Sequence, residues 1–187
     1  MPRNGSNPEV ASSPVSSPSA SDRELIGQLV ARFDDATNRR DEDGFRALWT
    51  KDASWSIGQP RPMSVTGLDA IVAEWHRLLG ATEWFFRASY AGIVDVSGDE
   101  AVGRWPCLEM STVSHPQSAA HSGYENRAFY EDYYVRREDR WLFSKRRYVY
   151  FWISDAPIKG QAVPATGDTL SDMPSYAAAK SYGVADQ

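Results

Sequence analysis

Residues 129–150 read FYEDYYVRREDRWLFSKRRYVY, and this stretch decides the fold. Two arms rich in aromatic and β-branched residues flank the short polar segment Arg137-Glu138-Asp139-Arg140. Such residues favour pleated, half-buried strands, so the stretch predicts a hairpin of two long strands joined by a tight turn. Polar side chains are mixed into both arms, as at Tyr130, Asp132 and Arg146. This mixture indicates a hairpin that lines a cavity as well as a core.

The composition excludes several classes of partner and site. The chain has 187 residues, a formal net charge of −5 and a single cysteine, Cys107. The negative charge argues against nucleic acid as a main partner, because phosphate binding needs a basic surface. One cysteine excludes an internal disulfide and a multi-cysteine metal site, and the three scattered histidines lack metal-ligand spacing. We therefore expect neither a metal nor a cofactor.

The ends of the chain differ in character from its middle. Residues 1–20 are rich in Ser and Pro, so we expect a disordered arm. Residues 21–154 carry the pattern of one folded domain, and residues 155–187 are expected to form an extended tail. No apolar run reaches the roughly 20 residues of a membrane helix, and no hydrophobic signal core is seen. We expect a cytoplasmic protein with no membrane partner.

Periodicity along the domain predicts helices first and strands afterwards. Helical spacing starts at Ser21, where Glu24 completes a capping box, and two further helices follow over 43–49 and 67–79. Strand patterns cover 53–57, 84–96, 100–113, 123–135 and 141–153. This order predicts an α+β fold. We expect a cone, in which a curved antiparallel sheet wraps around three N-terminal helices.

Strand alternation predicts which side chains face the interior of the cone. If Tyr130 points inward, so do Ala128 and Asp132, whereas Phe129, Glu131 and Tyr133 point outward. The corresponding inward set comprises Trp105, Cys107, Glu109 and Ser111 on the preceding strand, and Arg146, Tyr148 and Tyr150 on the last strand.

Several motifs in this order resemble the SnoaL-like group of the nuclear transport factor 2-like superfamily. They are the helix end at 34–41, the segments 45–55 and 67–71, and the hairpin pattern Tyr-x-Asp…Arg-x-x-x-x-Trp-x-Phe-x-x-Arg over 130–146. The resemblance covers about residues 22–153. It implies a cone-shaped α+β barrel that is a dimer or trimer, often paired through the outer sheet face. The superfamily includes dehydratases, isomerases, polyketide cyclases and non-catalytic proteins, so function has to come from the site.

Within this group, the chain resembles hexachlorocyclohexane dehydrochlorinase and scytalone dehydratase in its last hairpin. The resemblance implies a catalytic His at the start of the second strand, oriented by an Asp at the end of the first helix. The matching positions here are Phe86 and Asn38, so this His–Asp dyad is absent. Arg146 matches an Arg that assists the leaving group. The Asp–Arg–Asp set of limonene epoxide hydrolase could not be placed.

Four residues are the candidates for catalysis: Glu109, Tyr130, Asp132 and Arg146. Glu109 is either a buried acid suited to proton transfer or an outward residue paired with Arg127. Tyr130 either donates a hydrogen bond to substrate or is a core ring. Asp132 and Arg146 form either an active pair or an interstrand salt bridge at the cone mouth.

Six further residues are predicted to contact a small hydrophobic substrate: Asn38, Trp55, His76, Phe86, Cys107 and Tyr150. His76 is either a displaced base or a residue of the rim or surface. Asp34 or Asp35 on the first helix either replaces the lost carboxylate or is ordinary surface charge.

Two functions from different classes follow. The first is a cofactor-free lyase or isomerase that abstracts a proton from a hydrophobic cyclic molecule in a conical pocket. The alternative is a non-catalytic protein of the same fold that binds a small molecule or serves in assembly. An open pocket with a titratable group favours the first, and a pocket plugged by Trp55, Trp75, Trp84 and Trp105 favours the second.

Overall fold

The computed structural model describes residues 21–113 and 122–154. Two helices, α1 (Asp22–Arg39) and α2 (Glu42–Arg46), come first, and α3 (Leu68–Gly80) follows strands β1 (Trp49–Ile57) and β2 (Met63–Thr66). The remaining strands are β3 (Trp84–Ser89), β4 (Ile93–Ser97), β5 (Glu100–Val113), β6 (Ser122–Arg137) and β7 (Arg140–Ser154). The predicted α+β class is confirmed. The expected N-terminal arm and C-terminal tail lie outside the described residues.

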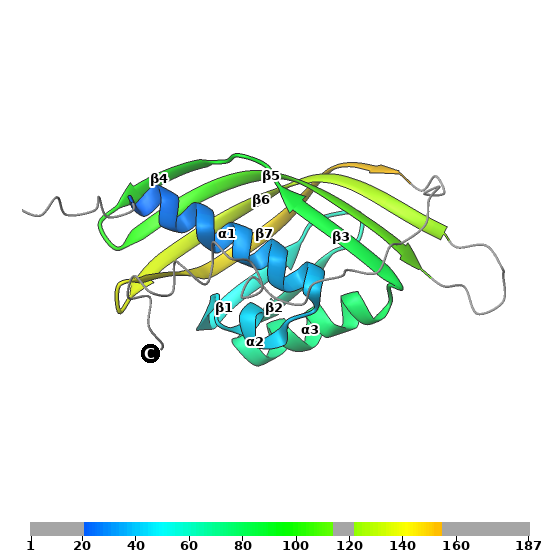
Figure 1. Cartoon of the computed structure of the whole chain (residues 1–187), viewed down its shortest axis with the longest axis horizontal. Helices are drawn as coiled ribbons and strands as arrows, with labels where there is room; N and C mark the ends of the chain where they lie inside the picture. Colours follow the sequence, from blue (N-terminus) through cyan, green and yellow to red (C-terminus); the bar gives the residue numbers. More distant parts are fainter. Residues whose placement is uncertain (1–20, 114–121, 155–187) are drawn as a thin grey trace, which may run out of the picture.

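Helix α1 forms where the sequence predicts it and carries the main helical contribution to the core. Ser21 and Glu24 make the expected capping box, in which each side chain bonds the other residue's backbone. Ile26, Leu29, Val30 and Phe33 recur at helical spacing and are all buried. Figure 1 shows α1 lying against the curved sheet, with α2 and α3 to one side.

The sheet has the strand order β2-β1-β7-β6-β5-β3, with β4 also paired to β5. All neighbouring pairs are antiparallel except β1 and β7, which run parallel, so the sheet is mixed rather than purely antiparallel. Strands β5, β6 and β7 curve together over α1, and β3 forms one edge (Figure 1). The predicted cone is confirmed, with this one change in strand direction.

The turn between β6 and β7 sets the register of the hairpin. Glu138 and Asp139 both have positive φ, at 49° and 60°, as a two-residue type I′ turn requires. The register then places Asp132 opposite Arg146 and Tyr130 opposite Tyr148. Ala128, Tyr130 and Asp132 are buried, whereas Tyr133 is half exposed. The predicted facing of this hairpin is therefore confirmed.

The strand predicted over 84–96 is interrupted over residues 90–92, which end in Gly92. A Cβ atom added there would lie 2.4 Å from the Trp105 ring, so only glycine allows the indole to approach so closely. The chain therefore leaves β3 after Ser89 and pairs again with β5 as β4. Strand β2 was not predicted. It adds to the free edge of β1, with Trp55 opposite Val65.

Candidate functional site

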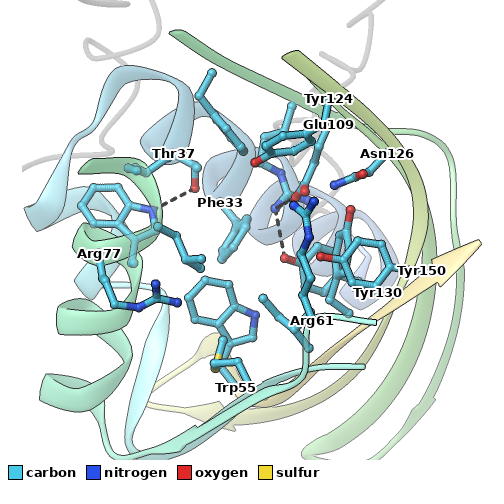
Figure 2. Close-up of a pocket in the computed structure, with 18 of the residues that line it drawn as sticks. Phe33, Thr37, Trp55, Arg61, Arg77, Glu109, Tyr124, Asn126, Tyr130 and Tyr150 are labelled. Carbon is cyan, nitrogen blue, oxygen red and sulfur yellow. Dashed lines mark hydrogen bonds and ion pairs between the residues drawn. The ribbon is translucent and has the colours of Figure 1, made fainter. Parts of the chain in front are cut away.

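A cavity of about 400 Å³ lies between α1, α3, β1 and the concave face of the sheet. Aromatic rings form much of its wall, including Phe33, Trp55, Trp75 and Phe85. Four phenols, one carboxylate and several polar groups also face it: Tyr124, Tyr130, Tyr148, Tyr150, Glu109, Asn126, Thr37, Arg61, Arg77 and Arg87. Figure 2 shows the labelled side chains converging on this space from helix and sheet. Its size and mixed lining are typical of small-molecule sites, which span roughly 300–1,000 Å³.

Glu109 is the one carboxylate among the described residues that line the cavity. Its side chain is 12% exposed, and an Oε1 atom lies 3.4 Å from Nη1 of Arg87. Arg127, the alternative partner, instead pairs with Glu125 on the outer side. Burial raises the pKa of Glu109, and the nearby Arg87 guanidinium lowers it only in part. The buried, inward alternative for Glu109 is therefore the one the structure shows.

Arg87 is the central side chain of the site, although the sequence pattern did not predict it. It is buried on β3 directly opposite Glu109 in the antiparallel register. Its Nε lies 2.7 Å from Oδ1 of Asp34, so the guanidinium stands between two acids. Burial by itself would lower the pKa of Arg87, but Asp34, Tyr130 and Glu109 outweigh that effect and raise it. The guanidinium therefore stays charged.

Two side chains of α1 hold β3 in place. The Asn38 amide donates to the Arg87 carbonyl at 2.9 Å and accepts from the Arg87 amide at 2.8 Å. One turn earlier, Asp34 accepts from the Ser89 backbone N–H at 2.6 Å and from the Ser89 hydroxyl at 3.2 Å. Both polar atoms of the Asn38 side chain thus bond the backbone of Arg87, and Asn38 does not line the cavity. Asp34 is buried, whereas Asp35 is an exposed residue close to Arg39.

Tyr130 combines the two alternatives that its sequence position left open. Its ring is buried against Phe33 and Tyr148, as expected for a core residue. Its hydroxyl also accepts a hydrogen bond from Nη1 of Arg87 at 3.2 Å and lies on the cavity wall (Figure 2). Burial raises the pKa of Tyr130, so the phenol keeps its proton and can donate it.

The pair of Asp132 and Arg146 lies away from the cavity, and neither residue lines it. Arg146 Nε donates to Asp132 at 3.0 Å, and both side chains are fully buried. The Tyr134 hydroxyl donates to the other Asp132 oxygen at 2.8 Å and accepts from Trp105 at 2.7 Å. The structure therefore shows the interstrand salt bridge that was one of the two alternatives. This salt bridge lies in the core of the domain, however, and not at the mouth of the cone.

The predicted substrate contacts divide into two groups. Trp55 and Tyr150 line the cavity, and burial raises the pKa of Tyr150 to about 12. Cys107 is buried beneath the wall and does not line it, and burial raises the pKa of its thiol to about 12. Trp75 belongs to the wall, whereas Trp84 and Trp105 do not, so the four tryptophans leave the cavity open.

Phe86 and His76 need correction as cavity residues. Phe86 is 40% exposed, because it alternates with Arg87 and therefore points out of the cone. The inward residue at this point of the strand is Arg87. His76 lies on the exposed side of α3, where it bonds Glu42 at 2.8 Å, in line with the surface alternative.

The structure also brings together an acid–arginine–acid group that could not be placed from sequence. Asp34, Arg87 and Glu109 form this group, but only the last two face the cavity. Among residues 21–113 and 122–154, no cluster of three or more His, Cys, Asp or Glu could hold a metal ion. Over the same ranges, every helix is too short or too polar to span a membrane.

Solved structures with this fold include enzymes of two kinds. A hexachlorocyclohexane dehydrochlorinase from Novosphingobium barchaimii LL02 superposes with a TM-score of 0.66 at 18% identity, covering 76% of this chain and 94% of that one. A type 2 hexachlorocyclohexane dehydrochlorinase gives 0.65 at 20% identity, covering 78% and 94%. A candidate scytalone dehydratase from Novosphingobium aromaticivorans DSM 12444 gives 0.62 at 17%, covering 75% and 94%. At these identities the likeness establishes the fold alone.

The sequence itself matches one family model. No curated protein is similar enough in sequence to count as a relative. Residues 18–147 match the model of the SnoaL-like domain, which covers α1 through about the first half of β7. The expected superfamily is thereby confirmed, and the chain belongs to the SnoaL-like family within the nuclear transport factor 2-like superfamily.

Proposed function

We propose that the protein is a cofactor-free lyase or isomerase that acts on a hydrophobic cyclic molecule by proton abstraction. One observation carries the proposal: Glu109 is a buried carboxylate on the wall of an open aromatic cavity, next to Arg87 and Tyr130. A carboxylate with a raised pKa is a stronger base than an exposed one, because its ionised form is poorly solvated. The fold neighbours named as a dehydrochlorinase and a dehydratase are consistent with this class.

The proposed reaction begins when the Glu109 carboxylate takes a proton from a ring carbon. In a lyase reaction, the electron pair of the broken C–H bond forms a C=C bond while the bond to the leaving group breaks, and Glu109 keeps the proton. In an isomerase reaction, the electron pair forms an enolate with its negative charge on the carbonyl oxygen, and the protonated Glu109 then returns the proton to another carbon. Negative charge then develops on the leaving group or oxygen. The Tyr130 hydroxyl, which accepts from Arg87, has its own proton free to donate to that charge.

Asp34 holds Arg87 in position from the side that faces away from the cavity. Its carboxylate contacts Arg87 at 2.7 Å and is otherwise bound to Ser89, so it fixes the guanidinium without facing the cavity. The cavity therefore suits a reaction that needs a single base better than one that needs two acids facing the substrate. Asp34 is a positioning residue in this scheme.

Hydrogen–deuterium exchange offers a test that does not require the natural substrate. The protein would be incubated in D₂O with chlorinated cyclohexanes, cyclic ketones and cyclic β-hydroxyketones, and followed by NMR and halide release. We expect deuterium uptake or elimination with at least one class, and its loss in Glu109→Gln. Glu138→Gln, an exposed acid in the turn between β6 and β7, is the matched control. Equal rates in Glu109→Gln and the wild type would overturn the proposal.

The non-catalytic alternative gives a different result in the same experiment. A binding protein would retain compounds from the panel and leave their carbon-bound hydrogens unexchanged. Because Arg87 partly neutralises Glu109, the cavity also suits binding of a polar ring compound without turnover. Tight binding together with no exchange for any compound would favour this alternative.

We also propose that the chain self-associates through the outer face of the sheet. Val102, Tyr133 and Phe151 expose apolar surface there, and Phe151 is 75% exposed. Arg147 and Glu131 add a charge pair on the same face, at 3.3 Å. Light scattering after gel filtration should show a dimer or trimer that Phe151→Lys weakens. A wild-type protein that stays monomeric would overturn this part.

A further inference from the structure

Three arginines line the cavity, and they differ in how their charge is balanced. Arg87 lies between Asp34 and Glu109. Arg77 is bound twice by Glu74, at 2.8 and 2.6 Å. Arg61 has no carboxylate within 4 Å among the described residues, and the contact it makes is with the Tyr124 ring, at 5.6 Å from the ring centroid. Arg61 therefore brings an unbalanced positive charge to the cavity.

The cavity has an exposed end, where Arg61 lies, and a buried end. It comes from the loop between β1 and β2 and is exposed, whereas Glu109, Arg87 and Tyr130 are deeply placed. Figure 2 shows Arg61 extending into the space near Tyr124 and Tyr150. A ligand that reaches the buried acid would thus have its other end beside a guanidinium.

The surroundings of Arg61 strengthen its attraction for an anion. Tyr124 and Tyr150 line the rim beside it and are half-buried, and burial raises the pKa of both while Arg61 lowers it. The centroid of the Tyr124 ring lies 5.6 Å from the Arg61 guanidinium carbon, and the ring covers part of the guanidinium. Guanidinium–carboxylate hydrogen bonds are stronger than neutral ones, so an anion would bind Arg61 in preference to a neutral group.

We propose that the substrate is a cyclic compound carrying a carboxylate, and that Arg61 binds this carboxylate at the rim while the ring occupies the aromatic cavity. This inference rests on the proposed function and names its substrate class. Arg61 is a specificity residue here, because it contacts the part of the ligand that does not react.

Two isosteric probes can separate charge from shape. Naphthalene-2-carboxylate and naphthalene-2-carboxamide share the same ring body and differ in charge at neutral pH. Calorimetric titration of the full chain should show one site, with the carboxylate bound about tenfold more tightly than the amide. Arg61→Gln should remove this preference by weakening only the carboxylate, and Arg61→Lys should retain part of it.

Arg32→Gln is the matched control, since this arginine is exposed on α1 and does not line the cavity. It should leave both affinities unchanged. Equal binding of the two probes to the wild type would overturn the inference, as would an equal loss of both in Arg61→Gln. Failure of both probes to bind would overturn it too, because the naphthalene ring is smaller than the cavity.

The outcome is independent of catalysis. Binding is measured without turnover, and the titrations can be repeated in Glu109→Gln, in which the proposed base is absent. A carboxylate preference in a protein that shows no proton exchange would uphold the inference about Arg61 and reject the proposed reaction. Proton exchange in a protein that shows no carboxylate preference would uphold the proposed reaction and reject the inference about Arg61.

Discussion

Two buried arginine–acid pairs lie on the same sheet, and they differ in what surrounds them. Arg146 and Asp132 are fully buried, and the guanidinium is packed among the rings of Phe33, Tyr130 and Phe143 at 3.8–4.3 Å. Arg87 is also buried and Glu109 is largely buried, but their polar ends reach an open cavity. The first pair is enclosed by protein on all sides, whereas the second has room for a ligand.

This difference teaches that burial alone does not identify a functional pair. Both pairs join residues directly opposite on neighbouring strands, and both contact Tyr130. The register places them at different heights along the strands, with Glu109 opposite Asn126 and Asp132 opposite Gly103. We therefore expect the core pair to control stability and the cavity pair to control chemistry. Four predictions test this division.

The largest expected effect is on stability, in Arg146→Met. Removing the guanidinium leaves the Asp132 carboxylate buried without its cationic partner, which typically costs about 3–5 kcal/mol of unfolding free energy. Arg46→Met is the matched control, because the pairs that Arg46 makes with Glu42 and Asp69 are solvent-exposed. That change should cost less than about 1 kcal/mol. Urea unfolding followed by circular dichroism measures both.

If Arg146→Met does not fold, the double variant Asp132→Asn/Arg146→Met keeps the prediction testable. It removes both charges and should recover a folded protein. If Arg146→Met were as stable as the wild type, the core pair would contribute nothing to the unfolding free energy. The expected division between a stabilising pair and a functional pair would then be wrong.

The next effect is on activity, in Glu109→Gln. Loss of a general base typically lowers turnover by about 10²–10⁴-fold. Folding should be retained, because the amide has the same shape and Arg87 keeps Asp34 as its partner. The rate would be measured on the compound that the deuterium-exchange panel identifies. A stability loss as large as that of Arg146→Met, with activity retained, would place Glu109 among the structural residues.

A pair of tyrosines sharpens the comparison at a smaller scale. Tyr130→Phe removes a hydroxyl from the cavity wall and should lower turnover about 10- to 100-fold, because one donor to the developing charge is lost. Tyr134→Phe removes the hydroxyl that joins Trp105 to Asp132 and should cost about 1–3 kcal/mol of stability instead. If Tyr134→Phe instead lowered turnover and Tyr130→Phe lowered the unfolding free energy, the roles assigned to the two tyrosines would be reversed.

The smallest expected effect is a dependence of stability on pH. Glu109 has a raised pKa in the folded protein, so between its unfolded and folded values the native state holds more protons than the unfolded state. Unfolding free energy then falls as pH rises through this window. Glu109→Gln lacks this titration, so its stability relative to the wild type should increase with pH. Thermal unfolding from acidic to neutral pH would show it, and parallel curves would contradict it.

Much of the fold could be predicted because the hairpin over 129–150 fixes its own register. The polar turn needs two residues with positive φ, and from there strand alternation gives the facing of Tyr130, Asp132 and Arg146. The capping box likewise fixed the start of α1. These features depend on residues close together in the chain, where spacing determines geometry.

Arg87 could not be found in the same way, because its facing depends on residues far away in sequence. The run Trp84-Phe85-Phe86-Arg87 is bulky at every position, so it shows no alternation that separates inside from outside. Because phenylalanine is more often buried than arginine, the pattern then predicts that Phe86 faces inward and Arg87 is exposed. The usable signal was indirect: a buried Glu109 needs a cationic partner, and β3 is the strand that supplies it. That pairing is a tertiary contact.

The bonds between α1 and β3 also bear on how the protein avoids aggregation. Strand β3 is an edge of the sheet, and such an edge normally presents free N–H and C=O groups to any strand from another molecule. Here the amide of Asn38 takes the place of a neighbouring peptide unit, and Asp34 occupies the next N–H along the same edge. The helix that orders the arginine thus also closes the strand against intermolecular pairing.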